Sequence, residues 1–430
     1  MDLNEIIKIT GGKLLNNYKK ICVKGIKFDS RKLSSSDLFI AIKGKFDDGH
    51  KYINKKMKCQ AIIVSENISC DIKIPIIKVS SSYEALFLLA QHWRLKYKLP
   101  LIAITGSNGK TTLKEMAYNI LSTKYKVLKN IGNKNNILGV AETLFNLNNE
   151  YDMVVMEMGM NHLGEIEKLS LMCEPECAVI TNIGSAHIGL LKNKKNIYKA
   201  KMEITKGLNG KLIVNGDDYY LNKNKCFKCG TKCHNDLIAY NIHIYDEYLK
   251  FNIYLDKEYE VIFNTPVKQY IPSLLEAIKI GIDYNIDIKE ILNCLKNFTM
   301  VDRRLKVNNL KTCKLIDDSY NASYESIKCG LEYLKRLNEK KIIILADMLE
   351  LGKYSKKYHK KLNYLLDKID NKEILTVGSY TKYIHSRHFN NNEEVIAYLK
   401  SIDLTNKYIY IKGSKAMNLD QISNFLTNTF

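Results

Sequence analysis

The segment from Leu101 to Tyr125 constrains the fold of this chain more than any other part of it. The run LIAIT predicts a buried strand, and the loop TGSNGKTT separates it from a helix-like stretch, TLKEMAYNILSTKY. Such a loop binds phosphate, because glycines let the backbone point its N–H groups inward and the helix N-terminus adds partial positive charge. The residues expected to bind a nucleotide are therefore Gly106, Ser107, Asn108, Gly109, Lys110, Thr111 and Thr112.

Two side chains of this loop predict catalysis with ATP. Lys110 is expected to reach the β and γ phosphates, and Thr111 to offer its hydroxyl to Mg²⁺. Ile104 stands where the usual spacing has a glycine, so the loop is a shorter variant, TGxxGKTT. A glycine turn that only caps a helix is the alternative, and the added GKTT favours phosphate binding.

Strands and helices alternate along the chain beyond this loop. The strands YDMVVMEM, CAVITNI and KLIVN are separated by the helices LGEIEKLSLM and IYKAKMEITKGL. This alternation predicts a parallel sheet covered by helices on both faces, and KLIVN is the last strand of the alternating run. Ligands of such sheets bind at the carboxyl ends of the strands.

The strand and helix pattern also predicts three domains. Short strands fill residues 1–82, the alternating pattern fills 83–299, and a second α/β pattern begins near residue 300. At 430 residues the chain is too long for one ordinary core. We expect an α/β protein with a small N-terminal α/β domain (1–82), a central P-loop parallel-sheet ATPase domain (83–299) and a C-terminal Rossmann-like domain (300–430).

Two residues that end strands beside the phosphate loop are candidate metal ligands. Glu157 ends the strand YDMVVME, and a carboxylate there is a hard oxygen ligand that suits Mg²⁺. His187 follows the strand that ends in TNIGSA, and a lone histidine is as often structural as functional. A salt-bridging or helix-capping role is the alternative for Glu157.

The composition of the chain limits which cellular compartment and which classes of binding partner we expect for it. The formal charge is +20, but lysine is spread along the whole chain and no basic stretch alternates with aromatic residues, so we expect no nucleic-acid partner. No segment has the pattern of a signal peptide or a membrane span, and we expect a cytoplasmic monomer that binds no membrane. The eleven cysteines are then expected to be reduced. Cys226, Cys229, Cys233 and His234 have irregular spacing for a zinc site, and a surface or strand position is the favoured alternative.

Several motifs together resemble the Mur ligase family over nearly the whole chain. They are FDSRKL, LFIAIKGKFDDGHKYI, TGSNGKTTLKEM, NKNNILGVAETL, MEMGMNHLGEIEKL, TNIGSAHIGLL, KAKMEI, IDDSYNASYESI, LADMLELG and IKGSKAM. The resemblance implies an ATP-dependent ligase that forms an amide bond through an acyl phosphate, with ATP and two Mg²⁺ ions as its cofactors. The last three motifs imply the substrates UDP-N-acetylmuramoyl-tripeptide and D-alanyl-D-alanine, and leave the third peptide residue open between diaminopimelate and lysine.

The resemblance also implies roles for individual residues. By it, Glu157 and His187 bind magnesium, and Lys201 carries a carbamate that acts as a further metal ligand. His187 and Lys201 are also implied in catalysis. Arg304 and Asp318 match positions that contact the nucleotide, Arg304 after closure of the last domain. The residues implied in substrate binding are Ser30 and Arg31 in the UDP-binding domain, Asn135 and Asn136 in the loop facing the nucleotide, and Asp347, Glu350 and Lys412 in the last domain. A turn or helix-cap role is an equal alternative for the residues of the last domain.

Some positions depart from the family pattern and keep different functions open. The segment Gln269–Ser273 lacks the asparagines of the family's HN..N motif, Gly189 replaces an acidic residue, and Ser323 and Tyr324 replace the end of YNANP. A folylpolyglutamate-type ligase shares the loop variant but needs no DSR segment in a leading domain. A P-loop switch or motor would use the same loop for movement, and a decayed relative would keep the fold without catalysis.

Overall fold

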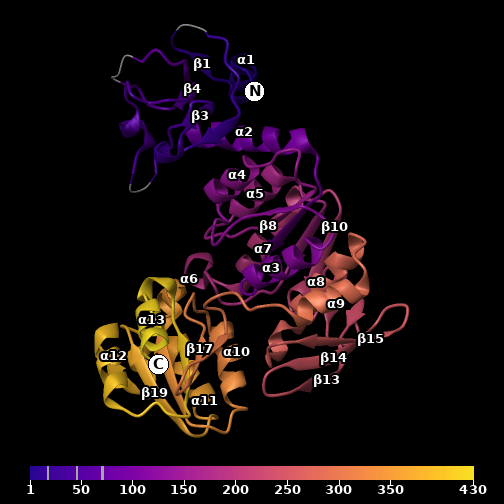
Figure 1. The fold of residues 1–430 in the computed structure, drawn as a ribbon, viewed down its shortest axis with the longest axis vertical. Coiled ribbons are helices and arrows are strands. Elements are labelled where there is room, and N and C mark those ends of the chain that lie inside the picture. The colour runs from indigo at the N-terminus through magenta and orange to yellow at the C-terminus, as the bar shows by residue number, and fades with distance from the viewer. Residues whose placement is uncertain (17–18, 45–46, 69–71) are drawn as a thin grey trace.

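The computed structural model describes residues 1–16, 19–44, 47–68 and 72–430. Its three α/β units follow one another along an elongated molecule, with the N-terminal unit at one end and the central unit between the other two (Figure 1). This architecture confirms the expected three-domain α/β fold class.

The N-terminal unit is a small sheet with helices packed beside it. Helix α1 (Leu3–Thr10) precedes five strands, which pair in the order β1-β5-β4-β3-β2. They are β1 (Lys13–Leu14), β2 (Gly25–Lys27), β3 (Asp37–Ile40), β4 (Ala61–Val64) and β5 (Ile76–Lys78). Helix α2 (Ser82–Tyr97) packs on α1 and also on the central unit, where the Trp93 ring meets Phe145 edge-on at 6.3 Å. The helix therefore connects the two units through a shared apolar core.

The central unit contains a seven-stranded sheet in which every pairing is parallel, in the order β12-β11-β10-β9-β6-β8-β7. Its strands are β6 (Leu101–Thr105), β7 (Val127–Lys129), β8 (Met153–Glu157), β9 (Cys177–Ile180), β10 (Lys211–Asn215), β11 (Phe227–Gly230) and β12 (Leu237–Ile238). The helices are α3 (Lys110–Leu121), α4 (Ile137–Leu144), α5 (Glu165–Cys173), α6 (Ile188–Leu191) and α7 (Lys194–Met202). The segment KLIVN forms β10, and the sheet continues beyond it through β11 and β12, two short strands that the alternating run does not include.

A second, antiparallel sheet belongs to the same part of the chain. It is formed by β13 (Tyr240–Ile244), β14 (Leu249–Tyr254) and β15 (Glu258–Phe263), and alternate residues of β14 are buried. Helices α8 (Ile271–Asp283) and α9 (Ile288–Lys296) follow, and both pack against α3. The helix that starts with the phosphate loop is therefore covered on its outer side.

The C-terminal unit is a six-stranded sheet in the order β16-β17-β21-β18-β19-β20, parallel except for its edge strand β16. The strands are β16 (Lys306–Asn309), β17 (Lys314–Asp317), β18 (Lys341–Ala346), β19 (Lys372–Val377), β20 (Arg387–Phe389) and β21 (Tyr408–Lys412). The helices are α10 (Tyr324–Leu334), α11 (Ser355–Leu366), α12 (Asn392–Ser401) and α13 (Asp420–Thr429). The carboxyl ends of β17 and β21 face the central unit, because Asp318 and Lys412 at these ends line a cavity together with residues of that unit.

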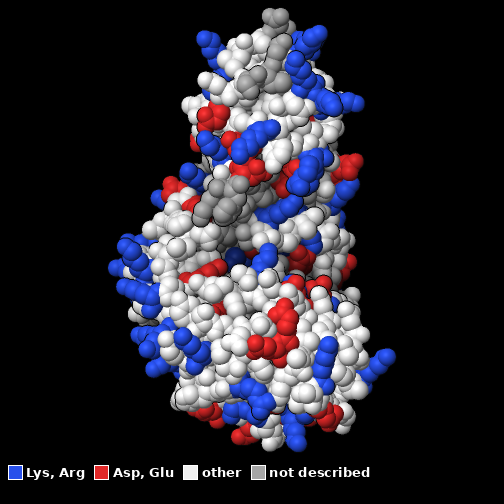
Figure 2. Space-filling model, turned by 90° about the vertical axis from the view of Figure 1, so that its left-hand side faces the viewer, with Lys and Arg blue, Asp and Glu red and all other residues white. Residues whose placement is uncertain are grey.

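The surface agrees with a dispersed charge. Lysine and arginine side chains are spread over the whole face seen in Figure 2 and are interspersed with acidic ones. Among the described residues, no helix combines the length and the apolar character that crossing a bilayer requires.

Candidate active site

The phosphate loop lies between β6 and α3, as the sequence predicts. Gly106 has a φ of +147°, and a Cβ there would come within 1.9 Å of Thr181 Oγ1, so only glycine fits. Gly109 adopts a φ of +82° directly before α3. The Lys110 ammonium folds back over the loop and donates to the carbonyl of Gly106 at 2.9 Å. Burial lowers the pKa of Lys110, so a phosphate anion at this place would stabilise its charged form.

Neighbouring residues of the central sheet hold the loop in this shape. The backbone N–H of Ser107 donates to the carbonyl of Asn182 at 3.0 Å, and that of Asn108 donates to the Asn182 side chain at 3.0 Å. The N–H of Gly184 donates to Ser107 Oγ at 2.9 Å. The loop is therefore tied to the segment after β9, which leads to His187.

Glu157 ends β8 beside this loop and is 2% exposed. Its Oε2 accepts a hydrogen bond from Thr111 Oγ1 at 2.7 Å, and its Oε1 accepts one from Asn135 Nδ2 at 2.7 Å. The hydroxyl and the carboxylate are hard oxygen donors next to a phosphate loop, which suits Mg²⁺. The residues present therefore fit the metal that the fold implies. Asn136, the neighbour of Asn135, caps α4 and lines a cavity between the central and C-terminal units.

Asn130 positions Glu157, and sequence reasoning missed it. Its side-chain amide donates to the carbonyl of Glu157 at 2.9 Å and accepts from the N–H of Glu157 at 2.9 Å. The fully buried Lys114 donates to the Asn130 carbonyl at 2.7 Å. An asparagine after the short strand β7 has no signal of its own in the sequence, because its role depends on pairing with β8.

His187 and Lys201 belong to neighbouring helices of the central unit. His187 has a φ of +62° at the start of α6. Burial, aided by the charges of Lys201 and Lys110, lowers the pKa of His187 to about 3, so the imidazole is neutral and able to bind a metal. Lys201 is fully buried, and its Nζ has no hydrogen-bond partner among the described residues. Burial lowers the pKa of Lys201 well below its usual range.

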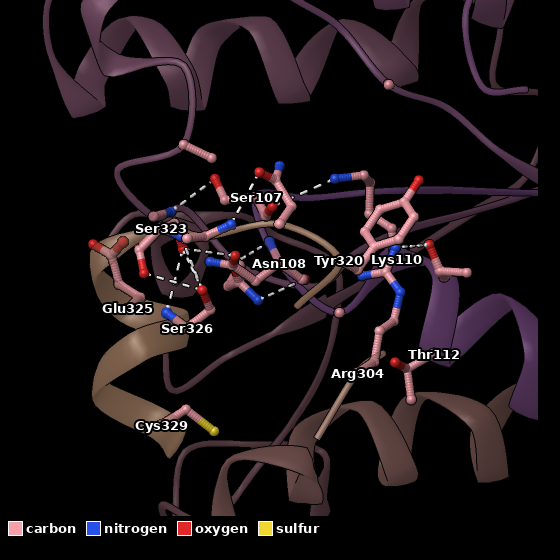
Figure 3. Close-up of a pocket in the computed structure, with 18 of the residues that line it drawn as sticks. Ser107, Asn108, Lys110, Thr112, Arg304, Tyr320, Ser323, Glu325, Ser326 and Cys329 are labelled. Atoms are coloured by element: carbon pink, nitrogen blue, oxygen red, sulfur yellow. Dashed lines mark hydrogen bonds between the residues drawn. The ribbon is translucent and has the colours of Figure 1, made fainter. Parts of the chain in front are cut away.

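The C-terminal unit contributes the other wall of the site (Figure 3). Arg304 donates from Nη2 to Thr111 Oγ1 at 2.9 Å, and its guanidinium lies 4.2 Å from the centre of the Tyr320 ring. Ser323 donates to Asn108 Oδ1 at 2.8 Å. Both contacts join residues of this unit to the phosphate loop, so the molecule is in a closed arrangement.

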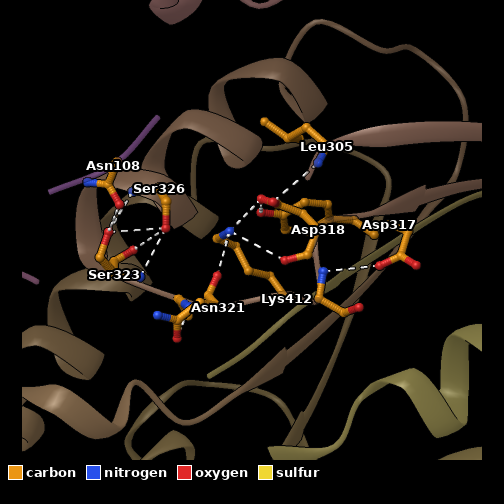
Figure 4. Close-up of polar contacts among 11 residues, drawn as sticks. Asn108, Leu305, Asp317, Asp318, Asn321, Ser323, Ser326 and Lys412 are labelled. Atoms are coloured by element: carbon orange, nitrogen blue, oxygen red, sulfur yellow. Dashed lines mark hydrogen bonds and ion pairs between the residues drawn. The ribbon is translucent and has the colours of Figure 1, made fainter. Parts of the chain in front are cut away.

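Asp318 and Lys412 form a buried ion pair within this unit (Figure 4). Lys412 Nζ lies 2.5 Å from Asp318 Oδ2 and donates to the Asn321 carbonyl at 3.1 Å. The other carboxylate oxygen of Asp318 accepts from the N–H of Leu305 at 3.2 Å. Both residues line the cavity between the central and C-terminal units. Through Leu305 and Asn321, the pair holds the backbone next to Arg304 and next to Tyr320.

One cavity of about 930 Å³ brings most of the predicted residues together between the central and C-terminal units. Its lining includes the loop from Ser107 to Thr112 together with Asn135, Asn136, Glu157, His187, Arg304, Asp318, Glu350 and Lys412. This volume lies within the range of small-molecule and cofactor sites in proteins. Among the described residues, no three or more His, Cys, Asp or Glu side chains surround a single metal position. Cys226, Cys229, Cys233 and His234 therefore do not form such a group.

Three predicted substrate residues lie outside this cavity. Ser30 and Arg31 belong to the 3-10 helix η1 (Ser30–Lys32) of the N-terminal unit, where Arg31 pairs with Asp29 at 2.9 Å. Asp347 supports the fold instead of facing the cavity: its buried carboxylate accepts from the backbone N–H groups of Ser379, Tyr380 and Thr381 at 2.8–2.9 Å. Asp347 therefore holds the turn after β19, which is the turn role that the sequence leaves open beside substrate binding.

Comparison with known proteins agrees with this geometry. Residues 104–275 match the model of the Mur ligase middle domain. The UDP-N-acetylmuramoyl-tripeptide--D-alanyl-D-alanine ligase of Rickettsia prowazekii is 33% identical over 93% of this chain and 94% of its own length. Crystal structure I of MurF from Acinetobacter baumannii superposes with a TM-score of 0.90 at 27% identity, covering 99% of this chain and 98% of that one. MurF ligase from Thermotoga maritima in complex with ADP gives a TM-score of 0.85 at 25% identity, covering 94% and 97%. Since the likeness spans the whole chain and the phosphate loop, Glu157 and Arg304 converge on one cavity, the chain belongs to the Mur ligase family, among the UDP-N-acetylmuramoyl-tripeptide--D-alanyl-D-alanine ligases.

Proposed function

We propose that this chain joins D-alanyl-D-alanine to UDP-N-acetylmuramoyl-tripeptide in an ATP-dependent, ADP-forming reaction, giving the pentapeptide precursor of peptidoglycan. The observation that carries the proposal is the contact of Arg304 with Thr111, which brings a cation of the C-terminal unit to the phosphate loop that already holds Lys110. The full-length relatives named for this activity support the same conclusion.

The reaction has two steps. The terminal carboxylate of the tripeptide attacks the γ-phosphorus of ATP, the bond to the β,γ-bridging oxygen breaks, and ADP leaves with an acyl phosphate formed. The amine of D-alanyl-D-alanine then attacks the acyl carbon, loses a proton and expels phosphate. Lys110 and Arg304 neutralise charge on the transferred phosphoryl group, and closure of the C-terminal unit excludes water from the acyl phosphate.

Magnesium belongs to the same site. Thr111 and Glu157 would hold one ion and His187 a second, and the metal supplies charge neutralisation on the phosphates and the reacting carboxylate. Asn135 orients the Glu157 carboxylate through its hydrogen bond of 2.7 Å.

We also propose that Lys201 carries a carbamate. Its Nζ bonds to the carbon of CO₂ and releases a proton, which exchanges a cation for an anionic oxygen ligand. The support is the unpartnered, fully buried Nζ, because an ammonium without any acceptor is unfavourable in such a place.

The substrate would extend from the N-terminal unit to the cavity. We propose the domain limits 1–82, 83–299 and 300–430, with Ser30 and Arg31 in the first domain holding the UDP end. Lys32, next to them, pairs with Glu142 of α4 at 3.3 Å, and the start of α4 at Asn136 lines the cavity. This path along α4 would lead from the UDP end to the reacting carboxylate. A cytoplasmic monomer completes the proposal.

Phosphate release from ATP tests this function. We expect release only with Mg²⁺ and UDP-N-acetylmuramoyl-tripeptide, with sustained turnover when D-alanyl-D-alanine is added and a product larger by the dipeptide in mass spectrometry. A folate substrate with glutamate serves as the comparison for the folylpolyglutamate-type alternative. ATP hydrolysis that needs neither peptide substrate would indicate a switch or motor instead.

A further inference from the structure

A direct backbone contact joins the central and C-terminal units beside the cavity. The segment η6 (Leu349–Tyr354) packs on α6, and Gly189 and Gly352 meet there. A Cβ on Gly189 would lie 2.6 Å from the backbone nitrogen of Gly352 and 2.8 Å from the carbonyl oxygen of Glu350. Gly352 has a φ of +52°, which few other residues adopt. No side chain therefore separates the two backbones.

This contact brings the Glu350 side chain to His187. Glu350 Oε2 lies 3.1 Å from His187 Nδ1, and the Glu350 side chain, which lines the cavity, is 36% exposed. Apart from this contact with Glu350, His187 Nδ1 is buried and has no polar partner among the described residues. The central unit supplies the imidazole and the C-terminal unit supplies the carboxylate, so the pair exists only when the two units are closed.

We propose that Glu350 binds a divalent cation together with His187, as a metal ligand that the C-terminal unit delivers on closure. The inference rests on the proposed function, in which His187 holds one of the magnesium ions. A carboxylate oxygen and a neutral imidazole nitrogen are both common metal ligands. Mg²⁺ in nucleotide sites usually has one or two carboxylates as ligands, with phosphates and waters as the others. Glu350 and His187 are therefore enough protein ligands for one ion.

The placement also couples metal binding to domain closure. An ion that contacts residues of both units binds the closed arrangement more tightly than the open one, and by linkage it favours closure. The glycine at position 189 is required for this coupling, because a side chain there would push residues 350–352 away from α6.

Manganese binding tests the proposal without relying on catalysis. The full chain with a non-hydrolysable ATP analogue is titrated with Mn²⁺, and free Mn²⁺ is followed by electron paramagnetic resonance. We expect Glu350→Gln to raise the dissociation constant of the lower-affinity Mn²⁺ site at least tenfold. Gly189→Ala should also raise this constant, although Glu350 is retained. The matched controls are Glu393→Gln, an exposed glutamate of the same unit, and Leu190→Ala, the exposed neighbour of Gly189. Both should bind Mn²⁺ as the unmodified chain does.

Two results would overturn the inference. Unchanged Mn²⁺ affinity in a folded Glu350→Gln variant, with a raised KM for D-alanyl-D-alanine, would assign the carboxylate to the ammonium group of that substrate. Unchanged affinity and unchanged kinetics would leave Glu350 without a role at the site. If the unmodified chain shows no dipeptide-dependent phosphate release, the proposed function fails, but the Mn²⁺ titration is still decisive because it needs only the nucleotide.

Discussion

At the scale of single residues, position and burial distinguish Lys110 and Lys201 from most other lysines of this chain. Most lysines of this chain are exposed, whereas Lys110 lies on the phosphate loop and Lys201 is fully buried with an unpartnered Nζ among the described residues. Burial lowers the pKa of both. A buried lysine needs a compensating partner, and for Lys201, whose Nζ has none among the described residues, a ligand or a modification can provide it.

Replacing Lys110 by alanine should abolish ligation while the protein still folds. The variant loses the charge that neutralises the transferred phosphoryl group, but no core contact. Steady-state phosphate release and circular dichroism measure the two effects, with Lys195→Ala, an exposed lysine, as the control. Turnover within about tenfold of the parent, a barrier change of under ~1.4 kcal/mol, would exclude this role for Lys110.

Replacing Lys201 by alanine should remove most activity, and a short carboxylic acid or chloride should restore part of it by filling the anionic position. The carbamate itself should give a ¹³C signal in active enzyme equilibrated with ¹³C-bicarbonate. Lys199→Ala, on the exposed side of the same helix, is the matched control and should keep both activity and signal. An unmodified lysine in a fully active, metal-loaded enzyme would contradict the carbamate while leaving the ligase function standing.

At the scale of elements, helix α10 holds the C-terminal unit to the central unit through the contacts of Glu325 with Ser185 and Lys194, which we call the latch. Its Glu325 accepts hydrogen bonds from the N–H and the hydroxyl of Ser185, at 2.8 and 2.6 Å, and pairs with Lys194 of α7 at 2.9 Å. Burial acts to raise the pKa of Glu325, but the bonds from Ser185 and the charge of Lys194 outweigh it and hold the pKa below its usual range. The segment from Ser185 to His187 is thereby held to the C-terminal unit.

Glu325→Gln should therefore favour the open arrangement. Partly exposed charge-assisted contacts of this kind contribute about 1–2 kcal/mol after screening by solvent, so the closed population relative to the open one should fall roughly 5- to 30-fold. Energy transfer between dyes on the central and C-terminal units measures the change. Lys194→Met should act in the same direction, and Lys195→Met is its exposed control.

The same latch has a defined pH dependence. Because the closed state lowers the pKa of Glu325, the latch is complete above the pKa of the open state and is lost as the pH falls through the closed-state value. The energy-transfer signal should therefore decrease with acid in the unmodified chain and change less in Glu325→Gln. An identical acid response in both would show that Glu325 does not hold the units together.

At the scale of the whole molecule, the cavity exists only between two units. Arg304 and Tyr320 follow the last helix of the central unit, yet Arg304 reaches the phosphate loop and the Tyr320 ring packs on its guanidinium. We propose a hinge near residue 300, because rotation about it would move the whole C-terminal sheet toward or away from the nucleotide.

Nucleotide should therefore compact the protein. We expect small-angle scattering to give a smaller radius of gyration with an ATP analogue, Mg²⁺ and tripeptide substrate than without ligand, because ligands that contact both units stabilise the closed arrangement. Lys110→Ala, with its weakened nucleotide site, should show less compaction. A radius of gyration that stays unchanged under saturating ligand would contradict a hinge.

Local pattern alone determined the phosphate loop, the alternating strands and helices, and the three-unit α/β class, because glycine spacing and apolar periodicity act over a few neighbouring residues. The short strands β11 and β12 and the sheet β13–β15 escaped it, because they depend on pairing with strands distant in the sequence. The motifs pointed to Glu157, His187 and Arg304, which the fold gathers around one cavity.

The same motifs could not distinguish Asp347 from Glu350, although the two carboxylates are three positions apart. Asp347 accepts from the backbone N–H groups of a turn, whereas Glu350 reaches the cavity and His187 beside the contact of Gly189 with Gly352. Only the tertiary structure decided between them, because the partner that satisfies a carboxylate depends on which backbones the closed units bring within hydrogen-bonding distance.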